Sequence, residues 1–204
     1  MTEVSLALPS SGLGTETPRE YFRRFLGLQA ASVHDLGWYF DQAVPQFADN
    51  PEVRLAVEEL VDQLGRAMGF TARREETAAY GDWESAGGSH LLVWVLDSQS
   101  AIRLIGQATR VREALLATPA LPVGAQATCL FVIGGPVNQR ALADTVTFRR
   151  SSDHIRLLTV DAARVLADLV ERGEVSHDAA LTLLRPAGVF ADPLVAMLQR
   201  PAAE

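Results

Sequence analysis

The chain has 204 residues, an apolar fraction of 48% and a charged fraction of 21%, which are ordinary values for one globular domain. Its formal net charge of −7 argues against a general nucleic-acid-coating role, because phosphate binding requires a basic surface. All 18 basic residues are arginine, so mechanisms that require a lysine, such as Schiff-base chemistry and P-loop phosphate binding, are excluded.

The cysteine content and the length of the apolar runs indicate in which cellular compartment the protein is expected. The single cysteine, Cys129, excludes an internal disulfide and a cysteine-based metal cluster, and its apolar neighbours predict a buried structural thiol. No apolar run reaches membrane-spanning length, and residues 1–16 lack the basic region of a signal peptide. We therefore expect a cytoplasmic protein with no membrane partner.

Helical patterns dominate the first third of the chain. Residues 1–16 are polar and glycine-rich and are expected to form a flexible arm. Thr17-Pro18-Arg19-Glu20 has the pattern of a capping box with proline at the first helical position. A second helix is expected from about residue 32 to the residue before Pro45, and an amphipathic helix from Asn50-Pro51 to Gly69.

The periodicity changes after Gly69. Strands are expected at residues 70–74, 80–85, 91–96, 127–133 and 155–159, with Gly87-Gly88 forming a tight turn at positive φ. Helices are expected from Ser98 or Ser100 to Leu115, over 138–143, from Asp161 to Gly173, from Ser176 to Arg185, and from Asp192 onward.

This order of elements predicts an α/β protein with a mixed central sheet flanked by helices. We divide the chain into a flexible arm (1–16), a helical extension (17–49), an α/β core (50–185) and a C-terminal tail with a short helix (186–204).

The order of motifs resembles the core of the PD-(D/E)XK superfamily, the restriction-endonuclease-like fold, from Val53 to Thr159. Residues 55–70, LAVEELVDQLGRAMGF, resemble the first core helix, which in that family often carries a glutamate facing the metal site. GDWE at 81–84 resembles the motif with the first aspartate, and LLVWVLDS at 91–98 resembles the strand that normally carries an acidic residue and a lysine. IRLLTVDAARVLADLV at 155–170 is similar to a late strand and helix of the family.

The resemblance implies a site in which carboxylates hold one or two divalent cations that activate a water. By strand phase, Asp82 takes the first carboxylate position, Trp94 the second, and Leu96 the position of the lysine. Trp94 cannot ligate Mg²⁺, Leu96 carries no charge, and arginine is not equivalent to the lysine. The sequence therefore predicts a nuclease fold that lacks the standard catalytic residues and needs no cofactor.

Two other hypotheses stay open. A divergent nuclease could bind Mg²⁺ or Mn²⁺ through Asp82, Glu84, Asp97 and either Glu58 or Glu59, with an arginine in support. Each carboxylate also has a structural explanation, as a turn residue, a solvent-facing strand residue, a helix cap, or the polar side of an amphipathic helix. An unrelated α/β small-molecule binder is the other hypothesis.

We expect the protein to act by binding, as a subunit or regulator of a DNA-processing or defence-type assembly. Aromatic residues concentrated in the N-terminal helices predict either a packed subcore or an interface, and the tail helix could also dock on a partner. The interface candidates are Tyr21, Phe22, Phe25, Trp38, Tyr39, Phe40, Leu194 and Leu198. Self-association is expected, most simply as a two-fold dimer.

Three arginines on one predicted helix are candidates for phosphate contact. Arg103 and Arg110 lie seven residues apart and share a face, with Arg112 nearby. A nucleic acid is therefore a further candidate ligand, and a solvated helix face is the alternative explanation.

Overall fold

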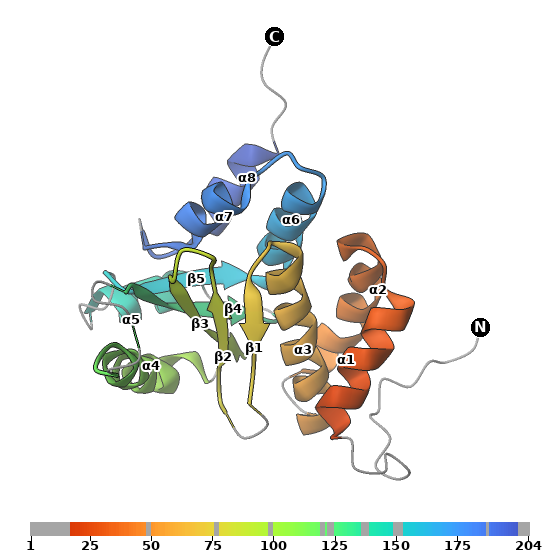
Figure 1. The fold of residues 1–204 in the computed structure, drawn as a ribbon. Helices are drawn as coiled ribbons and strands as arrows, with labels where there is room; N and C mark the ends of the chain where they lie inside the picture. Colours follow the sequence, from red (N-terminus) through yellow and green to blue (C-terminus); the bar gives the residue numbers. More distant parts are fainter. Residues whose placement is uncertain are drawn as a thin grey trace.

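The protein is represented by a computed structural model. It describes residues 17–47, 50–75, 78–97, 100–118, 121, 125–135, 139–148, 153–186 and 188–199, with the backbone alone for 101–103, 139 and 148. Within these residues, a five-stranded sheet lies between two unequal layers of helices (Figure 1). The predicted α/β class with a mixed central sheet is confirmed.

The helices begin close to where their capping residues predict. Thr17 and Ser32 each form a complete capping box, and the Asn50 side chain accepts hydrogen bonds from two backbone amides of the third helix. The helices in the described residues are α1 (Pro18–Gln29), α2 (Val33–Ala43), the 3₁₀ turn η1 (Val44–Gln46), α3 (Pro51–Ala67), α4 (Ala101–Leu116), α5 (Gln139–Phe148), α6 (Val160–Glu171), α7 (His177–Leu184) and α8 (Asp192–Leu198).

One predicted cap was wrong. The helix α6 begins at Val160, directly after a strand, and not at Asp161. Thr159 is the N-cap, because its hydroxyl accepts a hydrogen bond from the amide of Ala162 at 3.2 Å. Asp161 instead lies in the first turn, where a carboxylate favours the positive end of the helix dipole.

The sheet has the strand order β1-β2-β3-β4-β5. Its strands are β1 (Thr71–Arg73), β2 (Gly81–Glu84), β3 (His90–Leu96), β4 (Ala127–Ile133) and β5 (Ile155–Thr159). The first three strands pair antiparallel, and β3, β4 and β5 pair parallel, with α4 and α5 lying in the connections. The strand β3 is central in the sheet, and the turn at residues 85–89 contains Gly88 at the predicted positive φ, +72°.

The two faces of the sheet bury different helices. Every residue of β3 is buried, which explains why its sequence is continuously apolar. Leu91, Val93 and Val95 contact the core shared with α1, α2, α3, α6, α7 and α8. Leu92, Trp94 and Leu96 face the smaller core with α4 and α5.

The N-terminal helices belong to the larger core. Phe22, Leu26 and Phe40 are buried in the same cluster as the apolar side of α3. At the other end of the chain, Val195 of α8 joins this cluster, and Phe190 forms a parallel bridge with Leu157 of β5. Among the described helices, none is both long and apolar enough to cross a membrane.

Candidate functional site

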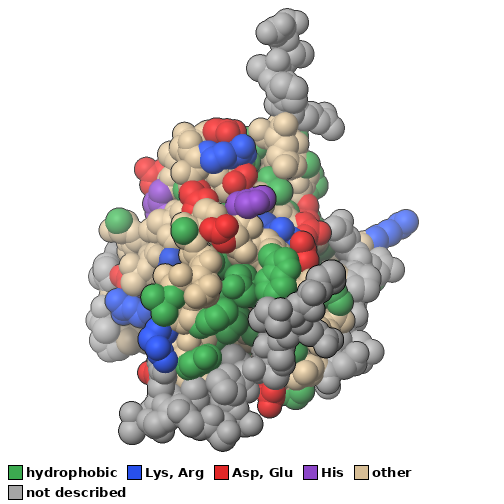
Figure 2. Space-filling model, turned by 90° about the vertical axis from the view of Figure 1, so that its right-hand side faces the viewer, with side chains coloured by type: hydrophobic (Ala, Val, Ile, Leu, Met, Phe, Trp, Pro, Cys, Tyr) green, Lys and Arg blue, Asp and Glu red, His purple; other side chains and the backbone are tan. Residues whose placement is uncertain are grey.

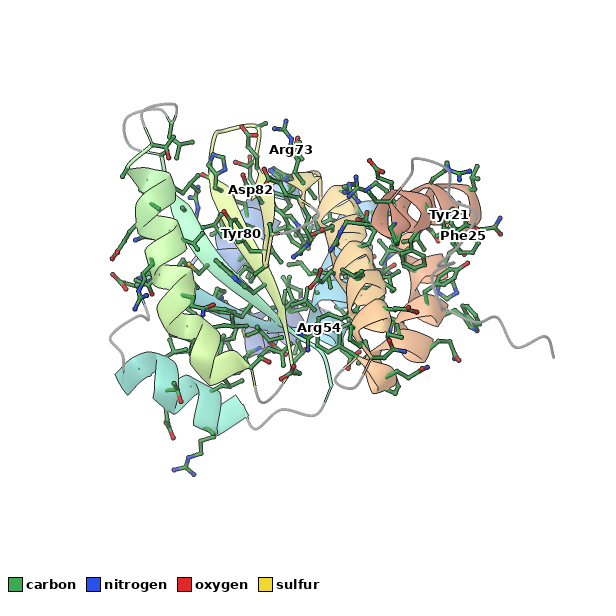
Figure 3. The ribbon with its side chains drawn as sticks, turned by 90° about the horizontal axis from the view of Figure 1, so that it is seen from below. Tyr21, Phe25, Arg54, Arg73, Tyr80 and Asp82 are labelled. Carbon is green, nitrogen blue, oxygen red and sulfur yellow. The ribbon has the colours of Figure 1, made fainter. Side chains whose placement is uncertain are left out.

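A cleft on the β1–β2 side of the sheet contains Asp82. Its volume is about 430 Å³, and Arg73, Tyr80, Asp82 and Leu92 are among its lining residues. Arg73 and Asp82 are directly opposite in the β1–β2 register, and Tyr80 precedes β2. Figure 3 shows these three side chains close together between α3 and α4. The cleft is therefore the place where the family resemblance implies a catalytic centre.

The Asp82 carboxylate contacts the imidazole of His90. Nδ1 of His90 lies 3.0 Å from one carboxylate oxygen and 3.2 Å from the other. An ionised carboxylate only accepts hydrogen bonds, so Nδ1 of His90 carries the hydrogen in this contact. The Asp82 side chain is 35% exposed and the His90 side chain 8%, so the carboxylate still faces the cleft.

Glu84 lies on the same face of β2 as Asp82, because residues two apart on a strand point to the same side. It is directly opposite His90 in the β2–β3 register and is half-buried. Asp82, Glu84 and His90 are thus neighbours on one surface of the sheet, and Asp82 and His90 are within hydrogen-bond distance of each other.

Trp94 lies on the same face of β3, two residues beyond Leu92, which is the residue opposite Asp82. It is 2% exposed, and its ring centroid lies 5.1 Å from that of Tyr80 and 5.4 Å from that of Phe131. Leu96, two residues further, is 1% exposed in the same core. Trp94 is therefore a core residue, and its aromatic neighbour Tyr80 is the one that lines the cleft.

Glu58 and Glu59 of α3 are held by arginines. Glu59 is fully buried and accepts hydrogen bonds from Nε and Nη2 of Arg23, at 2.9 and 3.0 Å, and from Nη1 of Arg66 at 2.9 Å. Glu58, 12% exposed, accepts from Nη2 of Arg19 at 2.8 Å. The hydrogen bond with Glu59 raises the pKa of Arg23 above its ordinary value. These carboxylates join α1 to α3, which corrects the expectation that they form the polar side of the helix.

A third carboxylate of α3, Asp62, lies in a fully buried ion pair. Arg74 donates to its two oxygens through Nε at 2.7 Å and Nη2 at 3.1 Å, and Trp83 Nε1 donates at 3.0 Å. Burial alone lowers the pKa of Arg74, but the Asp62 carboxylate raises it, and the net direction is upward. Asp62 therefore connects α3 to β2 and to the residue that follows β1.

Asp97 begins the connection to α4 and lies far from Asp82. Its carboxylate pairs with Arg54 at 2.9 Å and accepts hydrogen bonds from the amide and hydroxyl of Ser100. Asp82 is opposite Leu92, five residues before Asp97, so about 16 Å of strand separates them at roughly 3.3 Å per residue. Metal–oxygen bonds are about 2.0–2.6 Å long, so one cation cannot bind both groups.

The carboxylates that the sequence offered as cation ligands are therefore not assembled. Within the described ranges, no three His, Cys, Asp or Glu side chains come close enough together to hold a metal ion. Cys129 is buried between β4 and α4, and burial raises the pKa of its thiol to about 12. A thiol with that pKa is protonated at neutral pH and is a poor nucleophile.

The three arginines proposed for phosphate contact differ in their surroundings. The Arg103 side chain lies outside the described residues. Arg110 is exposed on α4, whereas Arg112 is half-buried and donates from Nε to the carbonyl oxygen of Ala127 at 2.8 Å. Arg112 thus ties α4 to the start of β4.

The interface candidates divide into buried and exposed residues. Phe22 and Phe40 are 4% and 1% exposed and fill the core between α1, α2 and α3, which corresponds to the packed subcore that was one of the two expectations for these aromatics. Trp38 is 46% exposed, and its ring contacts Tyr39 at 5.0 Å. The half-buried candidates are Tyr21, Phe25, Tyr39 and Leu194, and Leu198 is exposed. Figure 2 shows hydrophobic side chains gathered near the centre of the face that α1 and α2 form.

His90, Tyr80 and Arg73 are site residues that the sequence analysis did not select. The signal for His90 was available, because a short turn at Gly87-Gly88 returns the chain so that His90 lies beside β2. The signals for Tyr80 and Arg73 were absent, because the segment between β1 and β2 has no motif that fixes its length or path.

Comparisons with known proteins bear on the fold. No family model matches the chain, and no curated protein matches it. Among solved structures, it is similar to the restriction endonuclease FokI, with a TM-score of 0.51 and 12% identity over 83% of this chain and 34% of that chain. FokI bound to DNA gives a TM-score of 0.52 and 11% identity over 86% of this chain and 34% of that chain. The chain thus spans about a third of the FokI length, and the likeness shows a restriction-endonuclease-like fold.

We predict that Trp94→Ala lowers the free energy of unfolding by roughly 3–5 kcal/mol, because it removes a large buried ring from a packed aromatic cluster. Urea denaturation measures the change. Trp38→Ala is the matched control, since the same substitution at a half-exposed indole leaves no core cavity and should cost far less. Equal losses in the two variants would contradict the role given to Trp94.

Proposed function

We propose that this protein is a nuclease-fold protein that works by binding and does not cut, as a subunit or regulator of a DNA-processing or defence-type assembly. The observation that carries the proposal is the buried Trp94. Trp94 lies on the same face of the sheet as Asp82, at the position where the family resemblance implies the second carboxylate. An indole offers no oxygen ligand to a hard cation such as Mg²⁺.

The other groups around Asp82 support the same conclusion. Leu96 provides neither charge nor a hydrogen-bond donor, and Glu58, Glu59 and Asp62 of α3 are paired with arginines. In the part of the chain that the structure describes, Asp82, Glu84 and His90 are neighbours but are not grouped closely enough to hold a metal ion, so they do not fit the two-cation arrangement implied by the resemblance. Arg73 brings positive charge to the cleft, and a cation there would be repelled.

A protein partner is better supported than a nucleic acid. The net charge is −7, whereas phosphate binding relies on clustered positive charge. Large apolar side chains are exposed in the described residues: Leu28 at 74%, Trp38 at 46%, Met197 at 63% and Leu198 at 42%. The DNA-processing context rests on the likeness in fold to FokI, a restriction endonuclease that has been seen bound to DNA.

A divergent metallonuclease is the second candidate function, and Asp82 would be the central ligand of its metal ion. Its support is the half-exposed carboxylate in a cleft of about 430 Å³. The separation of Asp97 from Asp82 is the geometry that weighs against it. A small-molecule ligand in the same cleft has the support of the cavity alone.

We predict no cleavage of supercoiled plasmid or single-stranded DNA with Mg²⁺ or Mn²⁺ present. The reason is that Asp82, Glu84 and His90 are not grouped closely enough to hold the cations that activate water and stabilise the leaving group. Agarose and denaturing gels give the measurement, and Asp82→Ala prepared in parallel is the control for contaminating nucleases. Metal-dependent cleavage that disappears in Asp82→Ala would contradict this prediction and support the divergent metallonuclease.

We further propose that the protein self-associates, most simply as a two-fold dimer, through the exposed apolar side chains of α1–α2 or of α8. Sedimentation velocity across a tenfold concentration range should show a larger species as concentration rises. Leu28→Glu and Met197→Glu each place a charge on one of the two surfaces, so the variant that remains a monomer identifies the interface. A wild-type monomer at every concentration would contradict the proposal.

A further inference from the structure

A groove of about 500 Å³ runs between α2 and α6 on the side of these helices away from the sheet site. On α2 its lining residues are Val33, His34, Gly37, Trp38 and Asp41, and on α6 they are Asp161, Arg164, Val165 and Asp168. Both sets follow helical spacing of three and four residues, so each helix presents one continuous stripe to the groove. Its volume lies within the ordinary range of ligand sites, which is about 300–1,000 Å³.

Gly37 leaves room for the side chain of Arg164 at this groove. A Cβ built at Gly37 would come within 2.6 Å of Nη2 of Arg164, so the arginine lies flat across α2 at this point. Its guanidinium is held by Asp41 at 2.8 Å and lies 5.7 Å from the ring centroid of Phe40. Arg164 thus forms part of the floor, and the side chains on either side form the walls.

The walls carry exposed carboxylates around a half-exposed indole. The side chains of Asp41, Asp161 and Asp168 are 64%, 92% and 40% exposed. Asp161 lies 3.9 Å from Arg164, and Asp168 pairs with Arg172 at 3.1 Å. Three carboxylates therefore face one groove arginine and one rim arginine, and Trp38 presents 46% of its surface beside them. Acidic side chains are visible above the hydrophobic area of this face in Figure 2.

This combination selects a cationic side chain. An arginine or lysine over the face of an indole gains a cation–π attraction of about 0.5–2 kcal/mol, and neighbouring carboxylates add hydrogen-bonded ion pairs. A single ammonium or guanidinium would leave most of the groove unfilled, whereas a peptide segment can also cover the half-buried Val165. The net charge of −7 would further attract a basic partner and speed its association.

We propose that the α2–α6 groove binds a basic segment of a partner protein, with one arginine or lysine side chain seated on Trp38 beside the exposed carboxylate of Asp161. The inference rests on the proposed function, since it names the chemistry of the partner that such a binding subunit would take. The groove is separate from the Asp82 cleft and from α8, and it shares Trp38 with the exposed apolar side chains of α1–α2, so a dimer formed through α2 would cover it.

The test uses the full-length protein and a fluorescent peptide of alternating arginine and alanine, with an alternating glutamate–alanine peptide as the probe control. Anisotropy at near-physiological salt measures affinity. Tryptophan emission gives a second readout that reports the groove, because Trp83 and Trp94 are 0% and 2% exposed and Trp38 is the exposed indole. We expect the arginine peptide to bind and to change the emission, and the glutamate peptide to do neither.

Matched variants separate the groove from general charge attraction. Asp41→Asn with Asp161→Asn removes two groove charges, and Glu113→Gln with Asp144→Asn removes two exposed charges from α4 and α5 on the other layer. The first pair should weaken binding about tenfold more than the second, and Trp38→Ala should weaken it several-fold and abolish the emission change. All these substitutions are at exposed positions, so the variants should fold.

Equal weakening by the two charge pairs, or binding with unchanged tryptophan emission, would overturn the proposal by showing that attraction is unspecific. Absence of peptide binding by a protein that sediments as a dimer would overturn it in favour of a second copy over the groove. The peptide assay contains neither DNA nor metal, so absence of peptide binding leaves the proposal of a non-cutting nuclease fold intact. Conversely, DNA cleavage would contradict the non-cutting proposal without altering the peptide result.

Discussion

Three carboxylates on α3 held by arginines are the constraint on which the rest of this structure depends. Glu58, Glu59 and Asp62 reach α1, the helix's own last turn and the sheet edge through Arg19, Arg23, Arg66 and Arg74. A buried carboxylate without a partner would cost several kcal/mol, so each of these acids requires its arginine. The planar guanidinium, which donates to two oxygens at once, suits this task better than a lysine ammonium. The N-terminal helices are therefore fixed to the core by charge as well as by Phe22 and Phe40.

The ion pairs of the α3 carboxylates and the Asp82 cleft on the opposite face of the sheet together account for the proposed function. The α3 carboxylates stabilise the fold on one face and are engaged there. On the other face, Asp82 has Arg73, Tyr80 and His90 around it, and Trp94 is buried at the position where the family resemblance would place a second oxygen ligand. Aromatic packing of Tyr80, Trp94 and Phe131 replaces the polar, hydrated interior that a metal centre requires. A fold of this kind can remain stable while its use shifts to surfaces such as the α2–α6 groove.

Much of the fold could be predicted from local sequence signals, and much of the site could not. The capping boxes at Thr17 and Ser32, the continuous apolar strand around Trp94 and the glycine turn before His90 are short-range features, and each predicted its element. The pairing of Glu59 with Arg23, separated by 36 residues, depends on how α1 crosses α3, which periodicity does not specify. For the same reason, the helical pattern could not distinguish a buried Phe40 from an exposed Trp38. The close approach of Arg164 to Gly37 in the groove likewise joins residues far apart in sequence.

Cation binding at Asp82 is the most direct test of the central claim that this nuclease fold lacks a working metal site. Isothermal titration of the wild-type protein with Mn²⁺, compared with Asp82→Asn, isolates that carboxylate with almost no change in shape. The account predicts no saturable binding in the millimolar range and indistinguishable heats for the two proteins, because Asp82 with His90 is an incomplete ligand set. One equivalent of Mn²⁺ bound by the wild type and lost in Asp82→Asn would contradict it.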